Sequence, residues 1–167
     1  CLKKCVAINK ENEEAKKKLE KKKKAVIKEG GKKGQDIIGA AEMGGLEFFC
    51  TTFDEPDGDL ELLQMAMDAS NAEVDPSGEE RKGGSAPVGK MLFSAGAKDL
   101  VVCAYSPEFD QKGNPSKIHA TEWLQDVLKV VGVGSLVGEG TARAAKATLP
   151  GDADAGRFPI KMKDTAL

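Results

Sequence analysis

The sequence offers few side chains of the kinds that perform catalysis. His119 is the only histidine in 167 residues, and histidine is the residue that most often transfers protons in enzymes. It stands just before an expected helix, where the helix dipole disfavours its charged form. No Ser/His/Asp arrangement is evident around it, and acidic residues alone do not define one. We therefore expect a protein that is not an enzyme, with no catalytic residue, no cofactor and no small-molecule substrate.

Metal ligands are equally scarce. The run Asp57-Gly58-Asp59 resembles a fragment of a calcium-binding loop, but it lacks the twelve-residue ligand spacing with a terminal glutamate, so we expect a turn. The cysteines include no C-x-x-C pair, so no metal site is expected. We expect four reduced thiols, which fits a reducing intracellular compartment; an organelle, plastid or mitochondrion, is our working hypothesis. The thiols belong to Cys1, Cys5, Cys50 and Cys103.

A loop with four glycines in nine residues is the strongest candidate for contact with a ligand or another chain. Glycine allows positive φ angles and close backbone approach. The loop is not a phosphate-binding Walker loop, because it lacks Gly-Lys-Ser/Thr. It is not a dinucleotide fingerprint either, because a helix rather than a strand precedes it. Its glycines are Gly132, Gly134, Gly138 and Gly140.

The helix before this loop is predicted from its apolar spacing. One face is formed by residues at i, i+3, i+4 and i+7, namely Leu124, Val127, Leu128 and Val131. Thr121 is expected to be the N-cap, since its side-chain oxygen can accept from a free backbone N–H. Val130 is also apolar, so we expect the last turn to be deeply buried. Trp123 is expected to pack against a sheet, and stacking on a nucleic-acid base is the alternative.

These residues carry a family resemblance. Ala120-Thr121-Glu122-Trp123 begins the helix, the glycine loop follows, and an alanine-rich segment comes after it. In this order the chain resembles the C-terminal domain of alanyl-tRNA synthetase, and residues 90–94 and 100–104 are similar to paired strands of that family. The resemblance runs from about Leu46 to the C-terminus. It implies a small α/β domain that binds the elbow of tRNA and bridges synthetase domains, and it does not reach the catalytic or editing portions.

The glycine loop departs from the family pattern. The family has nearly continuous glycine with a lysine in it, whereas this loop has apolar residues in that place and Glu139 adds a negative charge. Affinity for nucleic acid rests mainly on cations at the phosphates. The departure therefore favours a role of the domain in packing rather than in binding RNA.

Charge divides the chain into two parts. Residues 1–34 hold 13 lysines and 5 acidic residues, a net charge of +8, whereas residues 35–167 have a net charge of −10. We expect a basic helical arm at 1–34 and a globular domain at 35–167. Residues 1–29 are predicted to form one helix, polar almost all round and resembling the family's coiled-coil connector, which Gly30-Gly31 and Gly34 end or hinge. The acidic body would repel phosphate, so a broad RNA-wrapping surface is not expected.

The remaining pattern predicts a mixed α/β (α+β) fold, with helices packed on a small mixed sheet behind the long lysine-rich helix. No apolar run approaches the roughly 20 residues that span a bilayer. The polar segments 75–87, 107–115 and 150–159 are expected to be loops. The expected elements are a short helix at 35–42, a strand at 46–53, a helix at 60–69, a hairpin of strands at 88–94 and 99–105, the helix from 121, a segment at 141–149 that could be helix or strand, and a helix at 162–167.

Two functions fit these observations. The first is a non-catalytic accessory or scaffold subunit of a larger protein complex, for which organellar membrane complexes are one class of host. Its basic arm would rest on an acidic subunit or on an anionic membrane surface. The second is the tRNA-binding domain of an alanyl-tRNA synthetase or of a stand-alone relative. The candidate residues for binding the partner or the RNA are Lys16, Lys17, Lys21, Lys24, Lys129, Arg143, Lys146 and the four glycines of the loop.

Overall fold

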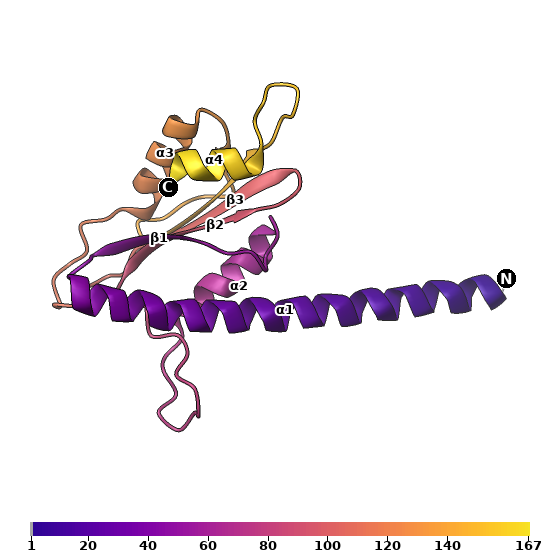
Figure 1. Ribbon diagram of the computed structural model, residues 1–167, viewed down its shortest axis with the longest axis horizontal. Helices are drawn as coiled ribbons and strands as arrows, with labels where there is room; N and C mark the ends of the chain where they lie inside the picture. The colour runs from indigo at the N-terminus through magenta and orange to yellow at the C-terminus, as the bar shows by residue number, and fades with distance from the viewer. Residues whose placement is uncertain (1) are drawn as a thin grey trace.

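A computed structural model describes the backbone of residues 2–167 and the side chains of residues 6–167. Five strands form one sheet with helices on both faces (Figure 1), so the predicted α+β class is confirmed. The expectation for the thiols of Cys1 and Cys5 lies outside the described side chains. The elements are α1 (Leu2–Gly44), β1 (Phe48–Thr52), α2 (Leu60–Asn71), β2 (Gly89–Ala95), β3 (Asp99–Tyr105), α3 (Ala120–Val131), β4 (Ser135–Leu136), β5 (Ala144–Pro150) and α4 (Pro159–Ala166).

The sheet has the strand order β1-β2-β3-β5-β4. β1 runs parallel to β2, and the other neighbouring strands are antiparallel. The predicted hairpin is confirmed as β2 and β3, in which Leu92 lies opposite Cys103. The segment at 141–149, for which the sequence allowed helix or strand, contains the strand β5. β5 pairs with the edge of β3 that faces away from β2, and its Lys146 lies opposite Cys103.

The apolar side chains of the strands form two layers, one on each face of the sheet, because successive side chains of a strand point to opposite faces. Phe93 and Val102 pack with α3 and α4 on one face. Leu92 and Cys103 pack with α2 and with Val26 of α1 on the other. In Figure 1 the sheet lies between α3 and α4 on one side and α1 and α2 on the other.

The glycines of α1 do not end or hinge the helix, so that prediction is wrong. α1 continues through Gly30, Gly31 and Gly34 to Gly44, and it includes the short helix that we expected as a separate element at 35–42. A Cβ atom on Gly30 would lie 2.5 Å from the carbonyl oxygen of Ala66, and one on Gly34 would lie 2.6 Å from that of Ser70. The glycines therefore let α1 and α2 pack closely, and this packing offsets their low helix propensity.

Two details of α3 also differ from the prediction. His119, not Thr121, is the N-cap, and its Nδ1 accepts from the N–H of Glu122. The Thr121 hydroxyl instead donates to the carbonyl of Thr141, which ties the helix start to the segment before β5. Val130 is 68% exposed rather than buried, because the apolar face turned to the sheet passes through Leu124 and its helical neighbours.

The other predicted elements are present. Asp59 is the N-cap of α2 and accepts from the N–H groups of Glu61 and Leu62. The C-terminal helix begins at Pro159, a residue suited to the first turn because it has no N–H to satisfy there. The polar segment between α2 and β2 and the one between β3 and α3 are both loops.

Candidate functional site

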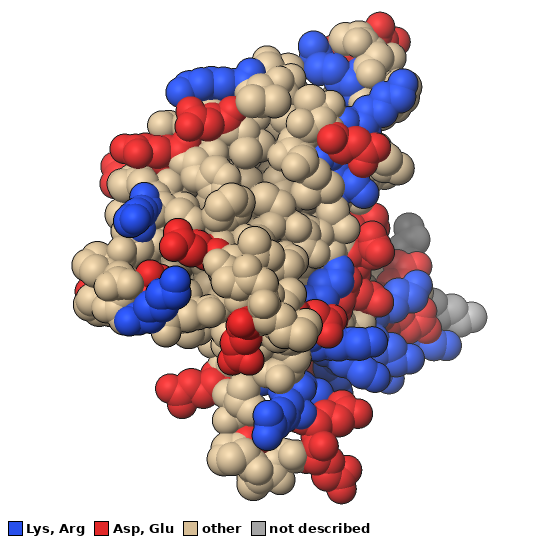
Figure 2. Space-filling view, turned by 60° about the vertical axis from the view of Figure 1, so that its left-hand side comes forward, with Lys and Arg blue, Asp and Glu red and all other residues tan. Residues whose placement is uncertain are grey.

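The most distinctive surface is the N-terminal part of α1. Residues 6–25, called here the free segment, extend beyond the body (Figure 1), and Val26 is the first buried side chain of the helix. Four predicted site residues lie on it, and lysines gather along α1 on the right of Figure 2. Lys22 lies 3.8 Å from Asp57, the one ion pair that joins the free segment to the body among residues 6–167. The four predicted residues are Lys16, Lys17, Lys21 and Lys24.

The free segment continues the side of α1 that is buried further along the helix. Val26, Gly30 and Gly34 face α2 at spacings of four residues. Going back from Val26 by seven residues reaches Leu19, and a further eleven reach Ile8, which lie on nearly the same side of the helix. Leu19 is 46% and Ile8 56% exposed. The free segment thus carries a sparse apolar stripe among its lysines, with nothing packed on it in the described chain.

The glycine loop is shaped largely by its own packing. Gly132 has φ 82° as the C-cap of α3, and its N–H donates to the carbonyl of Leu128. A Cβ on Gly134 would lie 2.7 Å from the Leu149 side chain, and one on Gly140 would collide with the Thr121 hydroxyl. Gly138 faces open space. Three of the four glycines are therefore explained by the fold without a ligand.

The three cations predicted around this loop do not converge. Lys129 is 2.9 Å from Asp126, and the guanidinium of Arg143 is 2.7 Å from Glu108. Lys146 lies on β5, where it lines a groove of about 500 Å³ together with Glu61 and Glu139. Lys129 and Arg143 are thus each paired with a carboxylate, and Lys146 shares its groove with two glutamates. None of the grooves described here contains these three cations together with the lysines of the free segment.

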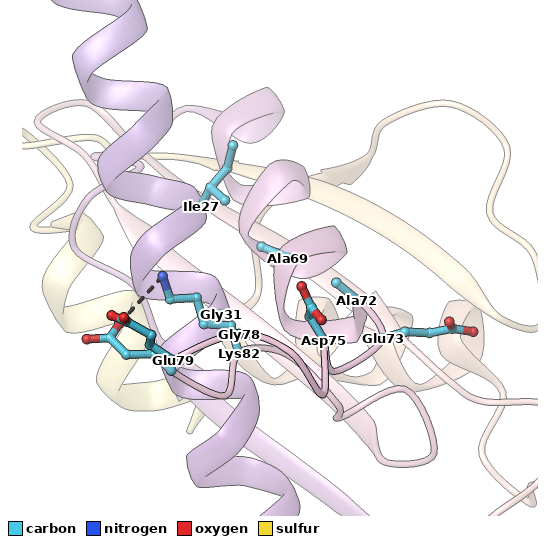
Figure 3. Close-up of a pocket in the computed structure, with 10 residues that line it drawn as sticks. Ile27, Gly31, Ala69, Ala72, Glu73, Asp75, Gly78, Glu79 and Lys82 are labelled. Carbon is cyan, nitrogen blue, oxygen red and sulfur yellow. Dashed lines mark ion pairs between the residues drawn. The ribbon is translucent and has the colours of Figure 1, made fainter.

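A groove with an acidic rim lies at the base of the free segment (Figure 3). It measures about 580 Å³, and Ile27, Ala69 and Ala72 form its apolar wall between α1 and the end of α2. Lys82, which also lines it, pairs with Glu80 at 3.5 Å. Hydrogen bonds from Ser77 lower the pKa of Asp75, so its carboxylate stays charged. Sequence reasoning predicted the loop but not this groove, because the α1–α2 contact that forms its wall was missed. The four carboxylates of the rim are those of Glu73, Asp75, Glu79 and Glu80.

A second groove lies between β1 and α3. Trp123 meets Phe48 edge to face, with ring centroids 5.6 Å apart and planes at 75°. The groove measures about 360 Å³ and is also lined by Ile118 and, on its polar side, by His119, Glu122 and Asp126. Trp123 packs against the core between the sheet and α3, as predicted. Phe48 was expected within a strand, and its partnership with Trp123 depends on a contact between distant segments.

The described thiols are poorly suited to reaction. Cys50 and Cys103 are free. Burial raises the pKa of both thiols, that of Cys103 to about 12, and the thiolate is the reactive form. Within residues 6–167 no three His, Cys, Asp or Glu side chains come close enough to hold a metal ion. The helices of the described chain include none that is both long and apolar enough to cross a membrane.

Lys90 is a buried cation that sequence reasoning missed. Its side chain is fully buried on β2, where Nζ donates to the carbonyl of Ser85 at 2.7 Å and to Oδ1 of Asn71. The same nitrogen lies 4.6 Å from the ring centroid of Tyr105. Burial lowers the pKa of Lys90 to about 7. The residue fastens the end of α2 and the following loop to the sheet, and it opens onto neither groove described above.

Comparison of the chain with protein-family models and with curated proteins found no match.

Proposed function

We propose that this chain is a non-catalytic accessory subunit, which joins a larger protein assembly through the free segment of α1. The observation that carries the proposal is the exposure of this segment along almost its whole length. A helix of about 20 residues without packing is only marginally stable in water, because most helical stability in proteins comes from tertiary contacts. A partner that covers the segment would supply those contacts.

The chemistry of the segment indicates the kind of partner. Residues 15–24 contain seven lysines and one glutamate, so the partner surface is acidic. An acidic protein subunit fits both the lysines and the exposed side chains of Ile8 and Leu19. An anionic membrane surface fits the lysines, each of which would contribute about 1 kcal/mol near such a surface.

The packing of the glycine loop supports the same proposal. Gly132 caps α3, and Gly134 and Gly140 are needed where side chains of the fold lie too close for a Cβ atom. Lys129 and Arg143 have carboxylates beside them. These features reduce what the loop could offer to phosphate, and they leave the free segment as the stronger candidate for contact with a partner.

The proposal is tested by sedimentation of a gently solubilised native extract with and without RNase. We expect the protein to migrate with a large particle whose sedimentation does not change with RNase. Mass spectrometry of that fraction then identifies the neighbouring subunits. A shift to light fractions on RNase treatment would contradict a protein assembly and favour the RNA-binding alternative.

A charge-reversal pair locates the contact. Replacing the four predicted lysines of the free segment by glutamate should release the protein from the heavy fraction. Replacing four exposed lysines of the body in the same way should leave it there, because the same number of charges changes away from the proposed contact. Equal retention of both variants would argue against docking through α1. The body lysines are Lys98, Lys112, Lys117 and Lys161.

The alternative is binding of tRNA, and the lysine cluster of the free segment is the observation that favours it. Seven cations in ten residues can neutralise several phosphates. If this is the function, affinity for tRNA falls steeply with salt, and replacing the four predicted lysines of the free segment by alanine lowers the slope. Binding that is already weak at ~150 mM salt, or that ignores these substitutions, would exclude it.

A further inference from the structure

The outer edge of β1 is open. The N–H of Gly89 donates to the carbonyl of Glu47, and the N–H of Phe53 donates to that of Phe93, so odd-numbered residues of β1 bond to β2. Backbone groups alternate between the two sides of a strand, so those of Phe48 and Cys50 point away from the sheet. No other described segment hydrogen-bonds to them there. Only the far end of this edge is covered, where Lys33 of α1 donates to the carbonyl of Thr52.

The open edge is bordered by aromatic and apolar side chains. Phe48 is 55% and Leu46 48% exposed, and the groove with Trp123 and Ile118 runs beside them on the α3 side. This side of the molecule comes forward in Figure 2, which shows a broad area of uncharged side chains with acidic ones near its border. An unpaired strand edge beside an apolar groove is the geometry that accepts an added strand.

Two carboxylates beside the groove favour a positively charged binding partner. Glu122 and Asp126 are one turn apart on α3 and line the groove. Asp126 is paired with Lys129, whereas Glu122 has no ion-pair partner among residues 6–167. An added strand turns alternate side chains toward α3. One apolar side chain would meet Phe48 and Trp123, and a basic side chain two residues away would reach Glu122.

We propose that the Leu46–Cys50 edge binds an extended, apolar and basic segment of a partner protein, which adds to the sheet as a sixth strand beside β1. The backbone of Phe48 and Cys50 would supply the hydrogen bonds, and the groove between β1 and α3 would select the side chains. This binding surface is separate from the free segment of α1, so it stands or falls independently of the function proposed above.

The experiment uses the full chain and a capped peptide, TLTKTLT, whose alternation places two leucines and one lysine on one face. Trp123 is the only tryptophan of the chain, so its fluorescence reports occupation of the groove. We expect a saturable change in its emission and slowed exchange of the amides of Phe48 and Cys50. The matched peptide TLTETLT, with the charge reversed, should bind about tenfold more weakly or not at all.

Protein variants identify the edge. Cys50→Pro removes the outward N–H without removing a bond to β2, since proline is accepted on an edge strand, and it should abolish peptide binding while the circular dichroism spectrum is unchanged. If Cys50→Pro unfolds the protein, Glu122→Lys serves instead: it should weaken TLTKTLT about tenfold and favour TLTETLT. Glu79→Lys, on the other groove, is the control and should change neither affinity.

Three results would overturn the proposal. One is the absence of a saturable Trp123 response at about 1 mM TLTKTLT. Another is equal binding of the lysine and glutamate peptides by the unsubstituted protein. The third is a concentration-dependent dimer that Cys50→Pro abolishes, because the edge would then bind a second copy of this chain rather than a basic segment.

Discussion

Lys90 shows how one buried side chain can couple this fold to pH. Its ammonium group reaches a carbonyl, an amide oxygen and an aromatic ring. These neutral partners satisfy its hydrogen bonds, and none of its hydrogen-bond partners is a carboxylate. The loss of hydration on burial therefore dominates, and it lowers the pKa of the folded state to about 7 from the ordinary 10.5.

We predict that the free energy of unfolding rises with pH above about 7. Between pH 7 and 10.5 the unfolded chain binds the proton that folded Lys90 has released, so raising the pH favours the folded state. Below pH 7 both states are protonated and this contribution is constant. The slope is at most about 1.4 kcal/mol per pH unit. Urea unfolding between about pH 7 and pH 8 measures it and stays below the ordinary titration of the Cys50 and Cys103 thiols, whose pKa burial raises in the folded state.

Lys90→Met is the control for this prediction. A methionine has a similar length and no charge, so the variant should show little dependence of unfolding free energy on pH over the same range. An identical slope in both proteins would mean that another group is responsible.

Residue-level reasoning from sequence succeeded where neighbours along the chain decide the outcome. Leu124 and its helical partners face the core, and Asp59 caps α2. It failed for Lys90, because the burial of an ammonium group depends on Asn71 and Ser85, which come from other segments. It also failed for Thr121, whose hydroxyl is used by Thr141 while His119 caps the helix.

At the scale of elements, the α1–α2 contact depends on small residues. Gly30 and Gly34 lie against the backbone of α2, whereas a Cβ on Gly39 of the same helix would meet nothing within 4 Å. The three positions have the same helical setting and differ in what lies beside them. They therefore separate intrinsic helix propensity from packing.

We predict opposite effects of alanine at these positions. Gly34→Ala should destabilise the protein by about 1–3 kcal/mol, because the new methyl group pushes α1 away from α2. Gly39→Ala should stabilise it by up to about 1 kcal/mol through helix propensity alone. Chemical unfolding of both variants tests the pair, and a stabilising Gly34→Ala would show that the helices do not pack as closely as described.

The glycines also explain which elements could be predicted. β1, β2, β3 and α3 were predicted because their apolar patterns are local, whereas β5 was left open between helix and strand and the short β4 was not predicted. The continuity of α1 was not, because a glycine that ends a helix and a glycine that accommodates a neighbouring helix look alike in sequence. The difference lies in α2, whose position against residues 26–34 of α1 is a property of the fold.

At the scale of the whole molecule, stability is distributed unevenly. Residues 26–41 of α1 are held under the body, and residues 6–22 have almost no contact with it. We predict that backbone amides of residues 6–22 exchange with solvent rapidly, while those of residues 26–41 are protected nearly as well as the strands. Hydrogen exchange with mass spectrometry measures both.

The same measurement distinguishes the isolated chain from an assembled one. In the purified host assembly, amides of residues 6–22 should become protected, because a partner covers the free segment. Strong protection of these residues in the dilute isolated protein would contradict the exposure described here and indicate self-association.

The free segment and the packed part of α1 form one unbroken helix. The direction in which the lysine cluster faces and its distance from the body are therefore fixed. At 1.5 Å per residue, Lys16 stands about 15 Å along the axis from Val26. One residue inserted after Ala25 would turn the whole cluster by about 100° and move it outward by only about 1.5 Å. Seven inserted residues, close to two turns, would nearly restore its bearing and extend its reach by about 10 Å. The two insertions thus separate the angular tolerance of the partner contact from its tolerance for distance.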